Sequence, residues 1–128
     1  MKVTRGHEQG MGSEQRGPTF TGTVWADPVL APTEGVTINT VFFPPGARTY
    51  WHSHDQGQVL LITHGQGWVQ VRDGEGTAVG PGDVVWFSPD EVHWHGAQPD
   101  SYLTHIAISL GGHEWLDEVT DAEYAVTG

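Results

Sequence analysis

The sequence predicts an all-β fold, and three observations favour this class. The 128 residues include 18 Gly and 8 Pro, which interrupt regular structure and form turns. Short runs rich in Val, Ile, Thr and aromatic residues recur between these turns at spacings of about 8–12 residues. Only the C-terminal end carries a helical signal. Together these observations indicate a sandwich or barrel of short strands rather than alternating strands and helices.

The expected strands follow one another along the middle of the chain. We predict them at residues 20–25, 36–43, 49–54, 58–63, 68–72, 84–87 and 102–110, each followed by a turn signal rich in Gly, Pro or Asp. The helical signal runs from Thr120 to Glu123, which have the spacing of a capping box. In such a box the Thr hydroxyl and the Glu carboxylate accept hydrogen bonds from backbone N–H groups that the helix leaves unpaired.

A chain of this length is expected to form one domain with a single core. Residues 1–18 contain little to bury, so we predict a flexible lead-in or an arm exchanged with another copy, followed by a single barrel domain at residues 19–128. Small barrels leave sheet edges exposed, and the run at residues 20–25 is suited to pairing with a neighbouring chain. The sequence therefore predicts a homodimer or a homotetramer.

Composition excludes several classes of partner. Asp and Glu number 16 against 5 Lys and Arg, and the resulting net charge of −11 disfavours nucleic acid and anionic membranes. No apolar run approaches the ~20 residues of a membrane helix, and the N-terminus lacks the apolar stretch of a secretory signal. The chain has no Cys and therefore no thiolate ligand. We expect a cytoplasmic protein that binds a small-molecule substrate.

Two pairs of histidines stand out. His52 and His54 form one pair, and His93 and His95 form the other. Side chains two residues apart on a strand point to the same face of the sheet, so each pair places two imidazoles on one side. Neutral ring nitrogens that converge inside a barrel can bind a metal ion, and Gln58 could add a carbonyl oxygen at the start of the next strand. The alternating residues, Trp51 and Trp94, should face away.

The remaining histidines carry weaker signals. His64 lies at a turn and His113 follows two glycines, so we expect both to be exposed, while His7 lies in the lead-in. His105 shares a strand face with Ala107 and Ser109, and its position fits equally a pocket wall or a hydrogen-bonded core histidine.

Two expected strands should supply the pocket walls. On one of them Thr37, Asn39, Val41 and Phe43 share a face, and on the other Leu103, His105, Ala107 and Ser109 do so. The candidates for substrate binding on these faces are Asn39, Val41, His105 and Ser109. Ordinary filling of the barrel explains the same positions equally well.

The spacing of the histidines resembles two motifs of the cupin superfamily. The first motif is matched by Gly46, His52, His54, Gln58 and Gly65, with Gln58 where most cupins carry Glu. The second resembles residues 82–93, with Pro89 displaced by one position, Asp90 in place of the usual Gly, and Ala97 in place of a terminal Asn. The resemblance implies a conical, jelly-roll-like barrel of two antiparallel sheets with a short C-terminal helical segment.

A narrower resemblance covers most of the chain from Phe20 to Tyr124. Residues 20–24, 45–49, 82–89, 93–97 and 104–108 are similar to the bacterial manganese-dependent cupin hydroxynitrile lyases and related small single-domain cupins. Carried over by position, it implies one divalent metal, with Mn expected and Fe, Zn, Ni or Co as alternatives, held by His52, His54, Gln58 and His93. It implies His95 as the acid–base residue of a C–C lyase that cleaves or forms cyanohydrins through a hydroxyl held at the metal.

A glutamine ligand changes the chemistry expected of such a site. Gln58 is neutral, so it leaves more of the metal's charge to attract an anionic oxygen and supplies no carboxylate base. Proton transfer would then fall to His95. Two alternatives stay open: a metal-dependent oxygenase or polyketide-type cyclase or isomerase, and a non-catalytic module that binds a small molecule.

Overall fold

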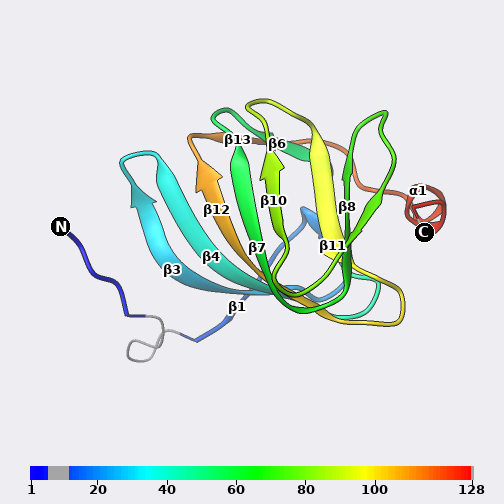
Figure 1. The fold of residues 1–128 in the computed structure, drawn as a ribbon, viewed down its shortest axis with the longest axis horizontal. Coiled ribbons are helices and arrows are strands. Elements are labelled where there is room, and N and C mark those ends of the chain that lie inside the picture. The colour runs from blue at the N-terminus through cyan, green and yellow to red at the C-terminus, as the bar shows by residue number, and fades with distance from the viewer. Residues whose placement is uncertain (6–11, 128) are drawn as a thin grey trace.

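The computed structural model describes residues 1–5 and 12–127. Its regular secondary structure is almost entirely β-strand and confirms the all-β prediction (Figure 1). The elements are β1 (Glu14–Gln15), β2 (Phe20–Thr21), β3 (Trp25–Thr33), β4 (Val36–Phe43), β5 (Arg48–Thr49), β6 (His52–His54), β7 (Gln58–Gly65), β8 (Gly67–Val71), β9 (Thr77–Val79), β10 (Val84–Phe87), β11 (His93–Ala97), β12 (Leu103–Leu110), β13 (His113–Trp115) and α1 (Asp121–Ala125).

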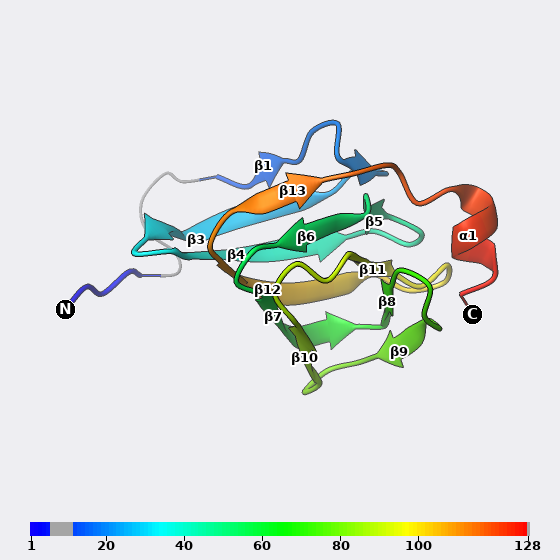
Figure 2. The same cartoon turned by 90° about the horizontal axis from the view of Figure 1, so that it is seen from above.

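The strands form two sheets that curl over each other. One has the order β1-β3-β4-β12-β7-β10, and the other has the order β13-β6-β11-β5-β2, with β8 paired to β11 and β9 paired to β8. Every strand pair is antiparallel. Figure 2 shows β13, β6 and β5 as one layer above β4 and β12 of the other sheet. The predicted barrel of two antiparallel sheets with a short C-terminal helix is confirmed.

Two predicted strands, β4 and β10, have the bounds expected from the sequence. The run at residues 49–54 is instead divided into β5 and β6. At the break, the backbone N–H of Tyr50 donates to the carbonyl of Thr19 and that of Trp51 donates to the carbonyl of Asp117. Hydrogen bonds to segments on either side of the sheet therefore interrupt the ladder at this point.

The run at residues 20–25 is divided as well. Phe20 pairs with Thr49 of the same chain, and β2 is the end strand of its sheet, so its other edge has no partner strand among the described residues. Gly22 follows with φ of +86°, and a Cβ atom there would lie 2.8 Å from the Cβ of Ala47. Only glycine satisfies both the left-handed conformation and this close approach. The chain then turns into β3 at Trp25.

The longest strand, β3, was missed because its sequence carries strand-breaking signals. It contains Pro28 and Pro32, which lack the N–H that a ladder requires. Its register against β4 shifts between Pro28 and Leu30 and again between Leu30 and Thr33. On its other side it pairs with β1 through Trp25 and Ala26. Pro28 and Pro32 therefore lie beyond the residues that pair with β1, where this edge of β3 has no partner strand among the described residues.

The N-terminal segment connects the two sheets. Glu14 and Gln15 pair with β3, and the backbone N–H of Arg16 continues this contact by donating to the carbonyl of Val24. A few residues later β2 pairs with β5 of the other sheet. His7 lies outside the described residues, and the mobility or exchange of residues 1–18 stays a prediction. Residues of the segment from β1 to β2 line the space between the two sheets.

Apolar side chains form two clusters. The larger lies between the sheets and includes Phe43, Leu60 and Leu103. The smaller contains Trp51 and Trp94, packed with Val119 and Tyr124 under the C-terminal segment. Both tryptophans therefore face away from the histidine side of their strands, as predicted.

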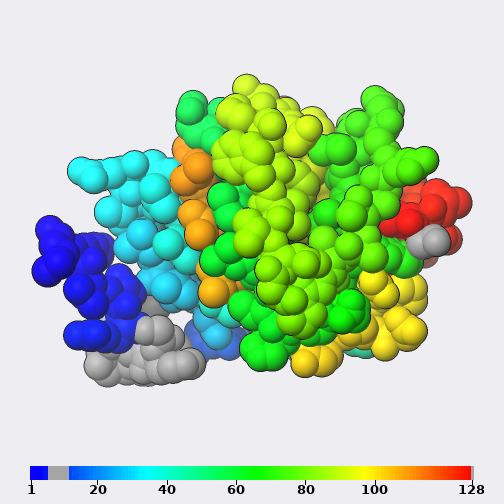
Figure 3. All heavy atoms as spheres, viewed as in Figure 1, coloured from blue at the N-terminus to red at the C-terminus, as the bar shows by residue number. Residues whose placement is uncertain are grey.

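The C-terminal helix follows the predicted capping box. Thr120 and Glu123 bind each other's backbone N–H groups reciprocally. Figure 3 shows the helix at the opposite side of the molecule from the N-terminal residues. Within the described residues, no helix is both long and apolar enough to cross a lipid bilayer.

Candidate functional site

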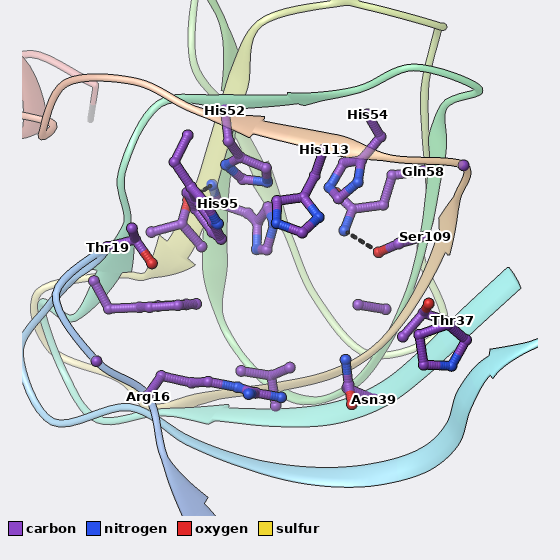
Figure 4. A pocket seen from close by; sticks show the side chains of 18 of the residues that line it. Arg16, Thr19, Thr37, Asn39, His52, His54, Gln58, His95, Ser109 and His113 are labelled. Atoms are coloured by element: carbon purple, nitrogen blue, oxygen red, sulfur yellow. Dashed lines mark hydrogen bonds between the residues drawn. The ribbon is translucent and has the colours of Figure 1, made fainter. Parts of the chain in front are cut away.

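A cavity of about 480 Å³ lies between the two sheets and brings most of the predicted site residues together (Figure 4). Its floor and walls come from β2, β3, β4, β5, β6, β7, β11, β12 and β13, together with the segment between β1 and β2. The polar side chains on its wall, apart from Trp, are Arg16, Thr19, Thr37, Asn39, Thr49, His52, His54, Gln58, His95, Ser109 and His113.

The pairing of β6 with β11 places His52 directly opposite His93. Their ring centroids are 4.3 Å apart. His54 and His95 lie two residues further along their strands and flank this pair on the same face, as the two-residue spacing predicts. All four imidazoles are less than a tenth exposed. The two motifs therefore converge through one antiparallel contact between short strands.

Backbone carbonyls fix the rings of His52 and His93. Nδ1 of His52 lies 2.9 Å from the carbonyl oxygen of Tyr50, and Nδ1 of His93 lies 2.8 Å from that of Glu91. A carbonyl only accepts, so each Nδ1 carries the hydrogen and each Nε2 has a free lone pair. This is the usual arrangement of a metal-binding histidine, whose second nitrogen is held by a hydrogen bond.

Gln58 points its amide toward the same place. Its Nε2 donates to Oγ of Ser109 at 3.1 Å, and its Oε1 lies 2.9 Å from Nε2 of His93. With the amide in this orientation, the oxygen and the free nitrogen of neutral His93 are two acceptors that face each other. A bound cation relieves that conflict because it accepts electron pairs from both atoms.

Several buried ring nitrogens have no hydrogen-bond partner among the described residues. They include both nitrogens of His54 and Nε2 of His95. The other nitrogen of His95, Nδ1, lies 2.9 Å from Nε2 of His105. A buried polar atom without a partner carries a desolvation penalty of about 1–3 kcal/mol. Unpartnered atoms on a cavity wall are therefore expected to meet a ligand, an ion or water.

Burial keeps these imidazoles neutral at pH 7. The pKa of His93 is lowered to about 3 and that of His54 to about 4; desolvation is the main cause in both, and His113 also contributes to the lowering at His54. Desolvation also lowers the pKa of His52, with a smaller contribution from His93. The pKa of His95 falls for the same reason, with His105 as the next cause. Neutral imidazole is the form that binds metals.

The histidines of this site fit a metal ion. One ring nitrogen each from His52, His93 and His95 lie within 4.8 Å of one another, so these three histidines can hold a metal. The sequence predicts a different third histidine, because it assigns His54 to the metal and His95 to proton transfer. Both residues lie on the cavity wall with Gln58. The ligand set His52, His54, Gln58 and His93 stays a prediction.

The predicted substrate-binding residues separate into two groups. Asn39, Val41 and Ser109 line the cavity, as do Thr37 and Ala107 on the same faces. His105 is completely buried and is not among the described lining residues. It contacts His95, so it supports a residue of the wall, and its direct contact with substrate stays a prediction.

Sequence reasoning missed other members of the wall. His113 is exposed, as predicted, yet it lines the cavity because β13 pairs it with His54. Trp115 follows on the same strand. Arg16 lies in the segment expected to be a flexible lead-in. These positions depend on pairing between segments far apart in the chain, for which no local pattern provides a signal.

Comparison with known proteins gives the same family from sequence and from structure. Residues 44–125 match the family described as the AraC-like ligand binding domain. The chain is 46% identical to an (R)-mandelonitrile lyase from Granulicella tundricola, over 97% of this chain and 98% of that protein.

Solved structures agree with this match. A cupin-like protein from Thermotoga maritima has a TM-score of 0.84 and 40% identity, over 94% of this chain and 98% of that one. A polyketide cyclase from Streptomyces resistomycificus has a TM-score of 0.75 over 96% of this chain and 91% of that one, and its 16% identity shows the shared fold alone. With its paired histidines on one face of a jelly-roll barrel, this chain belongs to the cupin family.

Proposed function

We propose that this protein is a metal-dependent lyase that cleaves and forms cyanohydrins. The observation that carries the proposal is a neutral, buried His95 on the cavity wall, whose Nε2 has no hydrogen-bond partner among the described residues and which lies beside the histidines that can hold a metal. The likeness to a protein named (R)-mandelonitrile lyase supports the choice of reaction, because it extends over nearly the full length of both chains.

The proposed ligands are His52, His54, Gln58 and His93, and the expected ion is Mn²⁺. A bound divalent ion would supply a Lewis acid that polarises the substrate hydroxyl. All four ligands are neutral at pH 7, so the protein itself compensates none of the ion's charge. The cavity is therefore suited to a substrate that becomes an anion during the reaction.

His95 is the proposed acid–base residue. Its Nε2 takes the proton of the substrate hydroxyl, the electron pair of that O–H bond forms the carbonyl, and the C–C bond to the nitrile carbon breaks. The leaving cyanide then takes the proton back from His95, so the products are an aldehyde and hydrogen cyanide. The contact with His105 at Nδ1 holds the ring in place, because both residues are buried.

The remaining wall offers surfaces for the organic part of such a substrate. Phe20, Val41 and Trp115 provide apolar contact, while Asn39 and Ser109 provide hydrogen-bonding groups. Wide apolar walls with a few polar groups are typical of small-molecule sites. An aromatic cyanohydrin matches this combination.

The test is cyanide release from mandelonitrile by protein purified without a His-tag. The expected result is metal-dependent release that disappears after treatment with a chelator and returns with Mn²⁺. His95→Ala should lose the activity, whereas His64→Ala should keep it, since His64 is exposed and is not among the described residues of the cavity wall. Oxygen consumption without cyanide release would reject the lyase in favour of an oxygenase.

A further inference from the structure

Arg16 is the only Lys or Arg among the described residues that line the cavity. The whole chain has 5 such residues. Arg48 is buried and bound to the carbonyl of Val119 and the carboxylate of Asp121, and Arg72 is paired with Asp117. In a protein with so few cationic side chains, one that lies on the cavity wall is a candidate for ligand binding.

The backbone around Arg16 is fixed in place. Glu14 and Gln15 pair with β3, and the N–H of Arg16 donates to the carbonyl of Val24 at 2.8 Å. In Figure 4 the Arg16 side chain lies with Asn39 at the opposite end of the view from His52 and His54. A molecule in the cavity therefore lies between a guanidinium on one side and the imidazoles on the other.

The charge on this wall has one sign. The described lining residues include no Asp or Glu, although the net charge of the chain is −11. Among the described residues, the acidic partner of Arg16 is Glu14, and their N and O atoms are 3.8 Å apart with both side chains partly exposed. That distance exceeds a hydrogen bond, and an exposed pair of this kind is strongly screened by solvent. Among the described residues, the Arg16 side chain therefore has no hydrogen-bond partner that competes with a ligand.

We propose that Arg16 binds the carboxylate of a small organic acid in this cavity. A guanidinium presents two parallel N–H donors to the two oxygens of a carboxylate, and such bonds are stronger than those between neutral groups. The aromatic side chains of Phe20 and Trp115 line the same space, so the preferred class is an aromatic 2-hydroxy or 2-oxo carboxylate. The proposal rests on the charges of the wall and not on the lyase activity.

The test compares two probes that differ only in the group that meets Arg16. Mandelate carries a carboxylate and mandelamide carries a neutral amide of similar shape, and their dissociation constants are measured by calorimetry on Mn²⁺-loaded protein. Arg16→Gln should weaken the binding of mandelate about tenfold to hundredfold, as expected for loss of a hydrogen bond to a charged group, and leave that of mandelamide unchanged. Arg16→Lys should give an intermediate dissociation constant for mandelate, because lysine keeps the positive charge and lacks the two parallel N–H donors of the guanidinium.

Two matched variants serve as controls. Arg72→Gln removes a cation that is not among the lining residues and should leave the affinity for mandelate unchanged. Glu14→Gln removes the acidic neighbour of Arg16 and should leave the affinity for mandelate unchanged or increase it. Equal weakening of both probes by Arg16→Gln would overturn the proposal, since it would indicate a damaged wall. Mandelate binding that does not respond to Arg16→Gln, or no binding to the wild type, would also overturn it.

Discussion

The rings of His54 and His95 stand at the same distances from the central pair of histidines. Each has its centroid 5.2 Å from that of His52 and 5.9 Å from that of His93. The two residues differ in their surroundings, because His95 is tied to His105 while both nitrogens of His54 have no partner among the described residues. This symmetry makes them a matched pair for separating metal binding from proton transfer.

We predict that His54→Ala lowers the metal content of the protein and that His95→Ala does not. His54→Ala should lose the metal, because it removes a ligand. His95→Ala should keep most of its metal and lose activity by about 10²–10⁴-fold, the usual contribution of general acid–base catalysis. Metal content by mass spectrometry and cyanide release are measured on both variants. Loss of the metal from His95→Ala with retention in His54→Ala would exchange the two roles.

The Gln58 ligand leads to a second prediction. Gln58→Glu adds a negative charge beside His93, so the variant should bind a divalent ion more tightly than the wild type. The same charge should weaken the binding of mandelate, because the cavity would no longer be purely positive or neutral. Competition with a chelator measures the first effect and calorimetry measures the second. Unchanged metal affinity would show that Gln58 does not contact the ion.

Stability of the metal-free protein should fall as the pH falls below about 6.5. The pKa of a free histidine is near 6.5, whereas burial holds the pKa of His54 and His105 at about 4 and that of His93 at about 3. Between these values the unfolded chain binds more protons than the folded one, so the free energy of unfolding decreases with decreasing pH. Urea denaturation at about pH 7.5 and about pH 5.5 measures the effect.

A variant of one buried histidine separates its contribution to the pH dependence of stability from those of other titratable groups. His105→Gln removes one completely buried imidazole and should make stability less dependent on pH, whereas His64→Ala at an exposed position should not. A wild-type urea midpoint that stays constant over this range would contradict the account of neutral buried histidines.

The outer face of the six-stranded sheet bears on the predicted homodimer or homotetramer. Trp25 and Phe42 are paired across β3 and β4 and are both more than a third exposed, and Trp86 on the edge strand β10 is 53% exposed. In Figure 3 the yellow-green segment that contains β10 lies on the molecular surface. Exposed aromatic side chains on a sheet face are typical of a surface that a partner covers.

We propose that a second copy of the chain covers this face. Light scattering should then give the mass of a dimer or tetramer, and Trp86→Glu should lower it toward that of a monomer, since a buried charge opposes association. Ala122→Glu, at an exposed position on α1 outside the six-stranded sheet, controls for the change in charge. A monomeric wild type at micromolar concentration would contradict the prediction.

Local patterns account for the parts of the fold that sequence reasoning reproduced. β4 and β10 are bounded by Pro and Gly turns, and the histidine pairs follow the two-residue period of a strand. The same period places Asn39, Val41 and Ser109 on the cavity wall. For His105 the sequence left open a pocket wall or a hydrogen-bonded core residue, and the structure has the hydrogen bond to His95.

The rest depends on contacts between distant segments. His113 reaches the cavity because β13 pairs with β6, and Arg16 reaches it because β1 pairs with β3. Neither pairing has a local signature, and β3 itself was hidden by its prolines. The two-residue period of a strand also does not decide whether His54 or His95 is the ligand, because each lies on the same face of its strand as the other histidine of its pair.

The central claim is that one divalent ion binds per chain through the two histidine motifs together. The most direct measurement is the metal content of the untagged wild type and of His93→Ala, purified side by side and exposed to Mn²⁺. The account predicts about one ion per chain in the wild type and almost none in His93→Ala, because the variant loses the ring that lies against His52 and whose Nε2 lies beside Oε1 of Gln58. Full metal occupancy in His93→Ala would contradict it.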